Sequence, residues 1–254
     1  MKKPITLLAA GLFAGSFSFS ALATEIIFDD PTDPINGSEI KQPEIEYTDF
    51  FVRAGYSTSN LCCGINFVRS DIETMKPAEP NEDPLPVRVW RDTDPANGGL
   101  GVDSGLADGD TDNFEGSLNN NANTDEILFF DFKGMVTLME VWLNAGDEAS
   151  GTSHQDKFSS DATDVFDIFY SMNGEDYFSI YGANTKPTDG ELLALTGDNL
   201  VNASYFAVAH VGPTDSVGGY IEKIKYASVP EPATLGLMGL GLLGLGVLRR
   251  KKAV

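Results

Sequence analysis

The chain has 254 residues, a formal net charge of −21 at pH 7 and only two histidines. Such an acidic surface repels nucleic-acid phosphate and anionic lipid, so we expect no nucleic-acid partner. The spacing of its histidines and cysteines does not fit a zinc site.

The N-terminus has the three parts of a secretory signal peptide: the basic residues Lys2 and Lys3, an apolar run over residues 5–19, and the small-residue sequence Ala21-Leu22-Ala23. These parts predict cleavage by signal peptidase after Ala23, at the A-x-A site formed with Ala21. Residues 1–23 are then removed, and the mature chain starts at Thr24. An uncleaved N-terminal helix is the alternative interpretation.

Residues 24–229 form the predicted extracytoplasmic body, and their number suits one β domain. Outside the signal and the C-terminal tail, Lys+Arg falls from 17 to 11 and Asp+Glu from 38 to 37, which gives a net charge of −26. This charge suits solubility outside the cell, and it also suits divalent cations or neutral glycans as ligands.

Short aromatic and β-branched runs predict strands along the whole body. They lie at residues 26–28, 50–52, 65–68, 87–90, 128–132, 136–143, 166–170, 177–181, 205–211 and 220–226. Many short strands with turn residues between them indicate an all-β sandwich. Residues 169–177 resemble the hairpin of galactose-binding-like jelly rolls, which implies a jelly-roll-like β-sandwich.

Local patterns also predict the connections. Lys133-Gly134 is expected to turn the chain, so that the following strand places Trp142 on the face of Val136 and Leu138. Asn173-Gly174 predicts a hairpin, because this dipeptide tolerates the positive φ values of tight turns. Residues 190–194 are expected to form at most a short helical turn.

The segment 92–125, rich in glycine, asparagine and acidic residues, carries carboxylates at Asp108, Asp110 and Asp112. Alternate oxygen ligands of this kind begin a calcium loop. The segment departs from the EF-hand pattern, since Asn119 stands where a bidentate glutamate is required. A looser calcium site on a sandwich loop and a solvated acidic loop both stay open; no other cofactor is expected.

The two cysteines, Cys62 and Cys63, are adjacent. Export places them in a compartment that permits disulfides, but a ring between neighbours closes no useful loop. Intermolecular pairing, a vicinal disulfide and two thiols are all open.

The chain shows no catalytic constellation. His154 lies in a polar stretch, His210 lies on a predicted strand, and no Gly-x-Ser-x-Gly sequence is present. With 37 acidic residues in the body, a chance pair of carboxylates is expected and carries no signal. We therefore predict no catalytic residue and no enzyme activity; an extracellular hydrolase is the minority alternative.

The C-terminal tail, residues 230–254, combines three features. Pro230-Glu231-Pro232 is followed by an uncharged Leu- and Gly-rich run over residues 233–248 and then by the basic residues 249–252, which include Arg249 and Arg250. As a helix the run spans about 24 Å, slightly short of a bilayer core of about 30 Å. The basic cluster stays cytoplasmic, so the body lies outside. The prolines keep the preceding peptide extended and accessible.

This order of parts resembles the PEP-CTERM sorting signal of bacterial exosortase substrates, with the match starting at Val229. The resemblance implies that a membrane-embedded exosortase recognises and cleaves the chain near Pro230–Pro232. Before cleavage the precursor is anchored in the inner membrane by a transmembrane helix, and after cleavage the body is at the cell surface or in the extracellular matrix.

Together these features predict a non-enzymatic exported protein that acts in exopolysaccharide, biofilm or cell-envelope assembly. Its expected partners are signal peptidase, exosortase, the membrane before cleavage, and polysaccharide. A calcium-assisted carbohydrate-binding or adhesin module is the alternative.

Overall fold

The computed structural model describes residues 23–28, 40–58, 61, 65–76, 85–92, 99–104, 125–145, 166–180, 192–210 and 219–229. Most of the predicted signal peptide, the tail from residue 230, both cysteines, the Asp108–Asp112 motif and His154 lie outside these residues. Among the described residues, no helix has the length and apolar character needed to cross a membrane. The predicted span 233–248 is not among them.

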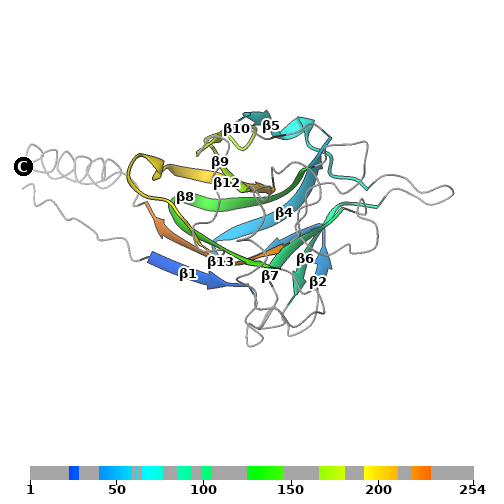
Figure 1. The fold of residues 1–254 in the computed structure, drawn as a ribbon, viewed down its shortest axis with the longest axis horizontal. Helices are drawn as coiled ribbons and strands as arrows, with labels where there is room; N and C mark the ends of the chain where they lie inside the picture. The colour runs from blue at the N-terminus through cyan, green and yellow to red at the C-terminus, as the bar shows by residue number, and fades with distance from the viewer. Residues whose placement is uncertain are drawn as a thin grey trace, which may run out of the picture.

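The described elements are β-strands and two short 3-10 turns, so the body is all-β (Figure 1). The strands are β1 (Ala23–Ile27), β2 (Ile40–Gln42), β3 (Glu44–Glu46), β4 (Phe50–Ser57), β5 (Phe67–Val68), β6 (Arg88–Asp92), β7 (Gly99–Asp103), β8 (Asp125–Ala145), β9 (Phe166–Ser171), β10 (Asp176–Ser179), β11 (Leu192–Ala194), β12 (Asn202–His210) and β13 (Gly219–Ser228). The turns are η1 (Arg69–Asp71) and η2 (Gly197–Asn199).

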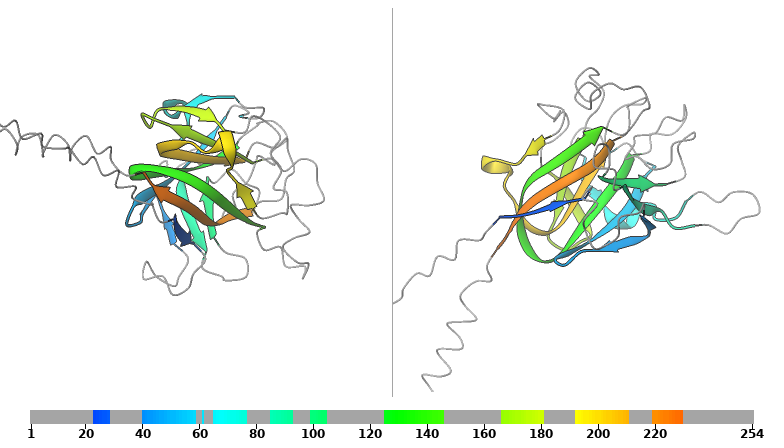
Figure 2. Two further views of the ribbon diagram at one scale, coloured as in Figure 1. Left: turned by 90° about the vertical axis from the view of Figure 1, so that its left-hand side faces the viewer. Right: turned by 90° about the horizontal axis from the view of Figure 1, so that it is seen from below.

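Strand β8, with 21 residues, organises the fold. Its first part, residues 125–132, pairs with β4 on one edge and with β12 on the other. Its second part, residues 136–145, pairs with β13 and β11. The strand therefore belongs to two layers, one with β4, β12 and β9 and the other with β13, β7 and β6, which face each other in Figures 1 and 2.

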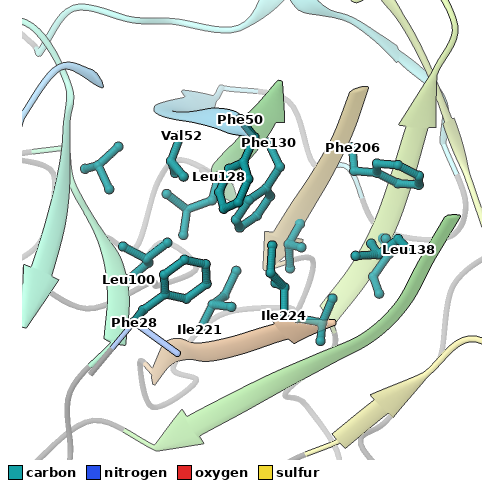
Figure 3. Packing of buried hydrophobic residues seen from close by; sticks show 14 of the residues in the cluster. Phe28, Phe50, Val52, Leu100, Leu128, Phe130, Leu138, Phe206, Ile221 and Ile224 are labelled. Atoms are coloured by element: carbon teal, nitrogen blue, oxygen red, sulfur yellow. The ribbon is translucent and has the colours of Figure 1, made fainter. Parts of the chain in front are cut away.

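The main core fills the space between these layers. Side chains from both layers meet there: Phe28, Phe50, Leu100, Leu128, Phe130, Phe206, Ile221 and Ile224 (Figure 3). Phe132 is buried in the same cluster, so the prediction that Leu128, Phe130 and Phe132 share one face is confirmed. The alternate residues Ile127 and Phe129 are buried in a second cluster on the other face. This double burial explains why residues 127–130 of β8 are a continuous apolar run.

The predicted turn at Lys133-Gly134 is wrong, because β8 continues through both residues. The backbone N–H of Lys133 donates to the carbonyl of Asp49 at 2.8 Å, and its ammonium donates to Glu46 Oε1 at 2.7 Å. Contacts with the β3–β4 connection thus hold this part of the chain extended.

The predicted position of Trp142 is also wrong. Glu140 pairs with Lys225, whereas Leu138 pairs with Tyr226, so Met139 is an extra residue in β8. A one-residue bulge moves every later side chain to the opposite face. Trp142 therefore lies outside the core, and the Lys223 ammonium sits 4.1 Å from its ring centroid.

Residues 192–194 form the strand β11, which pairs with residues 140–142 of β8, and not a helical turn. The predicted hairpin is confirmed, since β9 and β10 pair across residues 172–175. Gly174 has φ of 77°, and the Asn173 side-chain oxygen accepts the backbone N–H groups of Glu175 and Asp176 at 2.9 Å. The other predicted strands also lie within or overlap observed ones.

Strand β1 pairs antiparallel with β13, and Ala23 is the Cα partner of Ala227. The last described backbone hydrogen bond of the sheet runs from Val229 N–H to the Met135 carbonyl at 2.9 Å. The beginning and the end of the body thus lie side by side at one edge of the fold (Figure 1).

Candidate functional site

A pocket of about 330 Å³ lies between β3, the outer face of β4 and the segment 69–76. Its apolar lining comes from Pro43, Ile72, Met75, Pro86, Val87 and Phe129, and its polar lining includes Glu44, Arg53 and Arg69. A concave, mostly apolar surface with a few polar groups is typical of small-ligand sites.

The wall opposite β4 is fixed by backbone contacts. Tyr56 and Glu73 exchange two backbone hydrogen bonds, at 3.0 and 2.9 Å. This close approach needs a glycine in β4, because a Cβ on Gly55 would lie 2.7 Å from Ile72 Cγ2. The segment that carries Arg69 is therefore held rigidly over the second apolar cluster.

Two arginines meet at Asp131 beside this pocket. Arg69 donates to both carboxylate oxygens, at 2.8 and 3.1 Å, and Arg53 donates to Oδ2. The Asp131 side chain is only 7% exposed. The Arg69 guanidinium also lies 4.4 Å from the Phe129 ring centroid, which holds it against the apolar floor.

Burial disfavours the charged form of Arg69, but the hydrogen bonds to Asp131 and Tyr177 and the attraction of both groups together outweigh it, so the pKa of Arg69 is raised. Arg69 therefore stays a cation at any physiological pH. Asp131 holds the two guanidinium groups together, and its single charge leaves the trio with a net positive charge.

The second guanidinium nitrogen of Arg53 faces outward and forms an ion pair with Glu44. Both side chains are exposed, Arg53 to 39% and Glu44 to 40%. An exposed pair of this kind contributes between about 0 and 1 kcal/mol, so it opens readily. Arg53 thus pairs with the buried carboxylate of Asp131 and with the more exposed carboxylate of Glu44, which another anion can replace.

A second cationic cluster surrounds Asp103 on β7, whose side chain is 2% exposed. Arg88 donates to Oδ2 from Nε at 3.0 Å and from Nη2 at 2.5 Å, Lys76 donates to Oδ1, and Lys41 Nζ lies 3.7 Å from Oδ2. Burial alone would raise the pKa of Asp103, but the hydrogen bonds from Lys76 and Arg88 lower it below its ordinary value.

The Asp103 cluster and the pocket contain neighbouring residues from the same three segments of the chain. Lys41, Lys76 and Arg88 each lie within three residues of Pro43, Met75 and Val87, which line the pocket. We call the five cations Lys41, Arg53, Arg69, Lys76 and Arg88, together with their carboxylate partners, the basic band. These five cations pair with the three carboxylates Asp103, Asp131 and Glu44, and the further acidic residues Asp71, Glu73 and Glu175 lie on or against the same segments.

A different buried carboxyl lies at the start of β8. Asp125 accepts the Leu61 backbone N–H at 2.5 Å, and burial raises its pKa to about 7 although this hydrogen bond acts in the opposite sense. Leu61 is next in sequence to Cys62, which lies outside the described residues.

Of the site residues predicted from sequence, only Ala23 is among the described residues, so their arrangement stays a prediction. The calcium candidates Asp108, Asp110 and Asp112 lie outside the described residues, within which no group of three or more His, Cys, Asp or Glu side chains could hold a metal ion. Calcium binding and the state of Cys62 and Cys63 stay predictions. His210 is the last residue of β12, and its side chain is not described. The prediction that the protein has no enzyme activity is therefore untested and stays a prediction.

The sequence patterns did not predict the basic band, although basic residues are few in so acidic a chain. Isolated basic residues at strand positions gave the available signal: Arg53 in β4 and Arg88 in β6. What the sequence does not reveal is which carboxylates they meet, since Arg53 and Asp131 are 78 residues apart.

Residues 228–251 match the family described as the PEP-CTERM protein-sorting motif. No curated protein matches the chain.

Three solved structures from Clostridium perfringens show weak likeness. The CpGH89 CBM32-5 domain in complex with GalNAc-β-1,3-galactose is 10% identical, over 41% of this chain and 66% of its own, with a TM-score of 0.26. The CBM32-1 and CBM32-2 domains of ZmpB are 12% identical over 83% of this chain and 41% of theirs, with a TM-score of 0.31.

The ZmpB structure that also holds the M60 catalytic domain is 13% identical over 83% of this chain and 17% of its own, with a TM-score of 0.33. This chain therefore spans less than two thirds of each of the three. At these TM-scores the likeness supports no argument about function.

The sorting motif implies a membrane-anchored precursor that is exported and processed by an exosortase. It begins at Ser228, the last residue of β13. The chain is therefore a protein that carries the PEP-CTERM sorting motif.

Proposed function

We propose that the chain is a surface or extracellular-matrix protein whose jelly-roll-like β-sandwich body is released or transferred by exosortase cleavage near Pro230–Pro232. The observation that supports this proposal is that the described sheet ends directly before the proline of the sorting motif. The last described sheet hydrogen bond is made by Val229, and Pro230 follows directly. Cleavage after this point removes no described strand.

The N-terminal end supports the same processing scheme. Signal peptidase cleavage after Ala23 leaves residues 24–27 of β1 to pair with β13. Because β1 and β13 are neighbours, the two proposed cleavage sites follow or precede strands that pair with each other. The rest of the sheet, including the pocket and the basic band, is unaffected by either cut.

In this proposal the body acts by binding within exopolysaccharide, biofilm or cell envelope and not by catalysis. A carbohydrate-binding module is the second candidate, and the pocket favours it, because charged hydrogen-bonding groups stand there beside an apolar floor. Turnover of a polymeric substrate by the purified protein would favour the hydrolase alternative over both.

The test is the intact mass of the protein extracted from the surface of a host that contains an exosortase. We expect a chain that starts at Thr24 and lacks everything after about residues 230–232. Replacing both motif prolines, Pro230→Ala with Pro232→Ala, should leave the tail attached. Pro213→Ala, a proline outside the motif, is the matched control and should be processed normally. Retention of the tail in the natural sequence would contradict the proposal.

A further inference from the structure

We propose that the pocket beside Arg53 and Arg69 binds a carboxylate-bearing sugar, such as a uronic acid residue of a polysaccharide. This inference rests on the proposed function in one respect, since export to a matrix is what brings the body into contact with polysaccharide. The contacts of the basic band supply the rest of the argument.

The first step is that the pocket already holds a carboxylate at its outer end. Glu44 pairs with the outward guanidinium nitrogen of Arg53, and its side chain is exposed. A ligand carboxylate can take the same place, because arginine presents a planar donor array that matches carboxylate geometry. Since the exposed pair is weak, Glu44 is displaced at little cost.

The second step is that the buried carboxylate of Asp131 holds the two arginines in position. Asp131 is buried and receives hydrogen bonds from Arg53 and from Arg69, which also stacks on Phe129. The guanidinium groups are thereby ordered before a ligand arrives, which lowers the entropy cost of binding. With Glu44 displaced, two arginines face one aspartate, and the pocket favours an anion.

The third step is that the size and polarity of the pocket limit which ligand fits it. A volume of about 330 Å³ is at the lower end of the range for small-ligand sites and suits a compact unit. The exposed Met75 gives it apolar surface, and the buried side chains of Ile72 and Phe129 lie behind it. A uronic acid has both a carboxylate and a ring face with C–H groups, whereas a small inorganic anion would leave the apolar surface unused.

The fourth step is that a chain of such sugars fits better than one. Lys41, Lys76 and Arg88 lie one or two residues along the chain from residues that line the pocket, and they outnumber the one carboxylate that they share, so a second carboxylate of the same polymer can bind near them. The negative charge of the remote body surface is screened beyond about 8 Å at physiological ionic strength. The charges close to the pocket therefore determine the potential that the ligand meets.

The direct test is calorimetric titration of the protein purified from the host that exports it. The probes are a galacturonate tetrasaccharide, a galactose tetrasaccharide without carboxylates, and tetraglutamate. We expect binding of the uronate, no measurable binding of the neutral sugar, and at least about tenfold weaker binding of tetraglutamate. Equal binding of the neutral sugar would overturn the need for a carboxylate, and equal binding of tetraglutamate would overturn the sugar.

Two variants locate the site. Arg53→Gln should weaken uronate binding by about tenfold or more, since it removes a charge-assisted contact. Lys225→Gln is the matched control: it makes the same change in charge and breaks the 2.9 Å ion pair with Glu140 on the second part of β8. It should leave affinity within about twofold. Equal effects of the two variants would show a non-specific charge effect and overturn the site.

Glu44→Gln separates binding from structure. If Glu44 competes with the ligand, this variant binds the uronate more tightly than the natural protein. If Glu44 only supports the fold, the variant binds equally or more weakly, and the proposal fails. Because Glu44 is exposed, this variant keeps the test valid even if Arg53→Gln does not fold. The titration and the mass measurement above have independent readouts, so failure of one proposal is distinguishable from failure of the other.

Discussion

Ala23 and Ala227 lie opposite each other in the antiparallel pair of β1 and β13, although 203 positions of the chain separate them. The first of these residues adjoins the predicted signal peptidase site, and the second adjoins the PEP-CTERM motif. The first and last strands of the described body therefore pair with each other.

Gly55→Ala tests the wall of the pocket. The added Cβ would lie 2.7 Å from Ile72 Cγ2 and 3.1 Å from the Glu73 carbonyl oxygen, so the segment 69–76 must move away from β4. We expect a loss of about 1–3 kcal/mol in the free energy of unfolding, measured with urea. Gly134→Ala in β8 is the control, because nothing lies within 4 Å of its added Cβ. An equal loss in both variants would contradict the close approach.

Phe50→Ala tests the core between the two layers. Phe50 is fully buried and contacts the rings of Tyr47, Phe130 and Phe132. Its truncation should cost about 3–5 kcal/mol in the free energy of unfolding.

Phe178→Ala provides the comparison for this variant, since the Phe178 side chain is 42% exposed. It should cost well under half as much in the same urea experiment. Similar losses at the two positions would show that the layers do not close over Phe50.

Asp125→Asn tests the buried carboxyl. Burial raises the pKa of Asp125 from 3.8 to about 7, so the folded state binds its proton more tightly than the unfolded state. Stability from this group is complete below about pH 4 and is lost as the pH rises toward 7. The shift corresponds to a loss on the order of 4 kcal/mol. Asparagine keeps an acceptor for the Leu61 N–H and carries no charge.

The difference in unfolding free energy between Asp125→Asn and the natural protein should therefore grow in favour of the variant between pH 4 and 7 and stay constant above. Asp198→Asn, at an exposed position in η2, should show no such growth. A constant difference for Asp125→Asn across this range would contradict the burial of an ionisable group.

Features with a local cause were predictable from the sequence. The alternation of Leu128, Phe130 and Phe132 gives the core face of β8, and Asn173-Gly174 gives the hairpin, because each depends on neighbouring residues alone. The continuity of β8 was not predictable, since Lys133 is held extended by Asp49 and Glu46 from another strand connection. The face of Trp142 depends on a bulge whose register is set by β13.

The candidate site could not be predicted from the sequence for the same reason. Arg69 and Asp131 are 62 residues apart, and Arg88 meets Asp103 only because β6 and β7 pair. In a chain with 38 acidic residues, no local rule selects the two aspartates that the cations surround. The sorting motif was recognisable because its three parts are contiguous.

The central claim is that the chain is a precursor whose body is separated from its tail at the PEP motif. The intact mass of the protein extracted from the cell surface tests this most directly. The predicted result is a single species that starts at Thr24 and ends close to Pro230–Pro232. A species that retains residues 233–254 in a host with an active exosortase would contradict the claim.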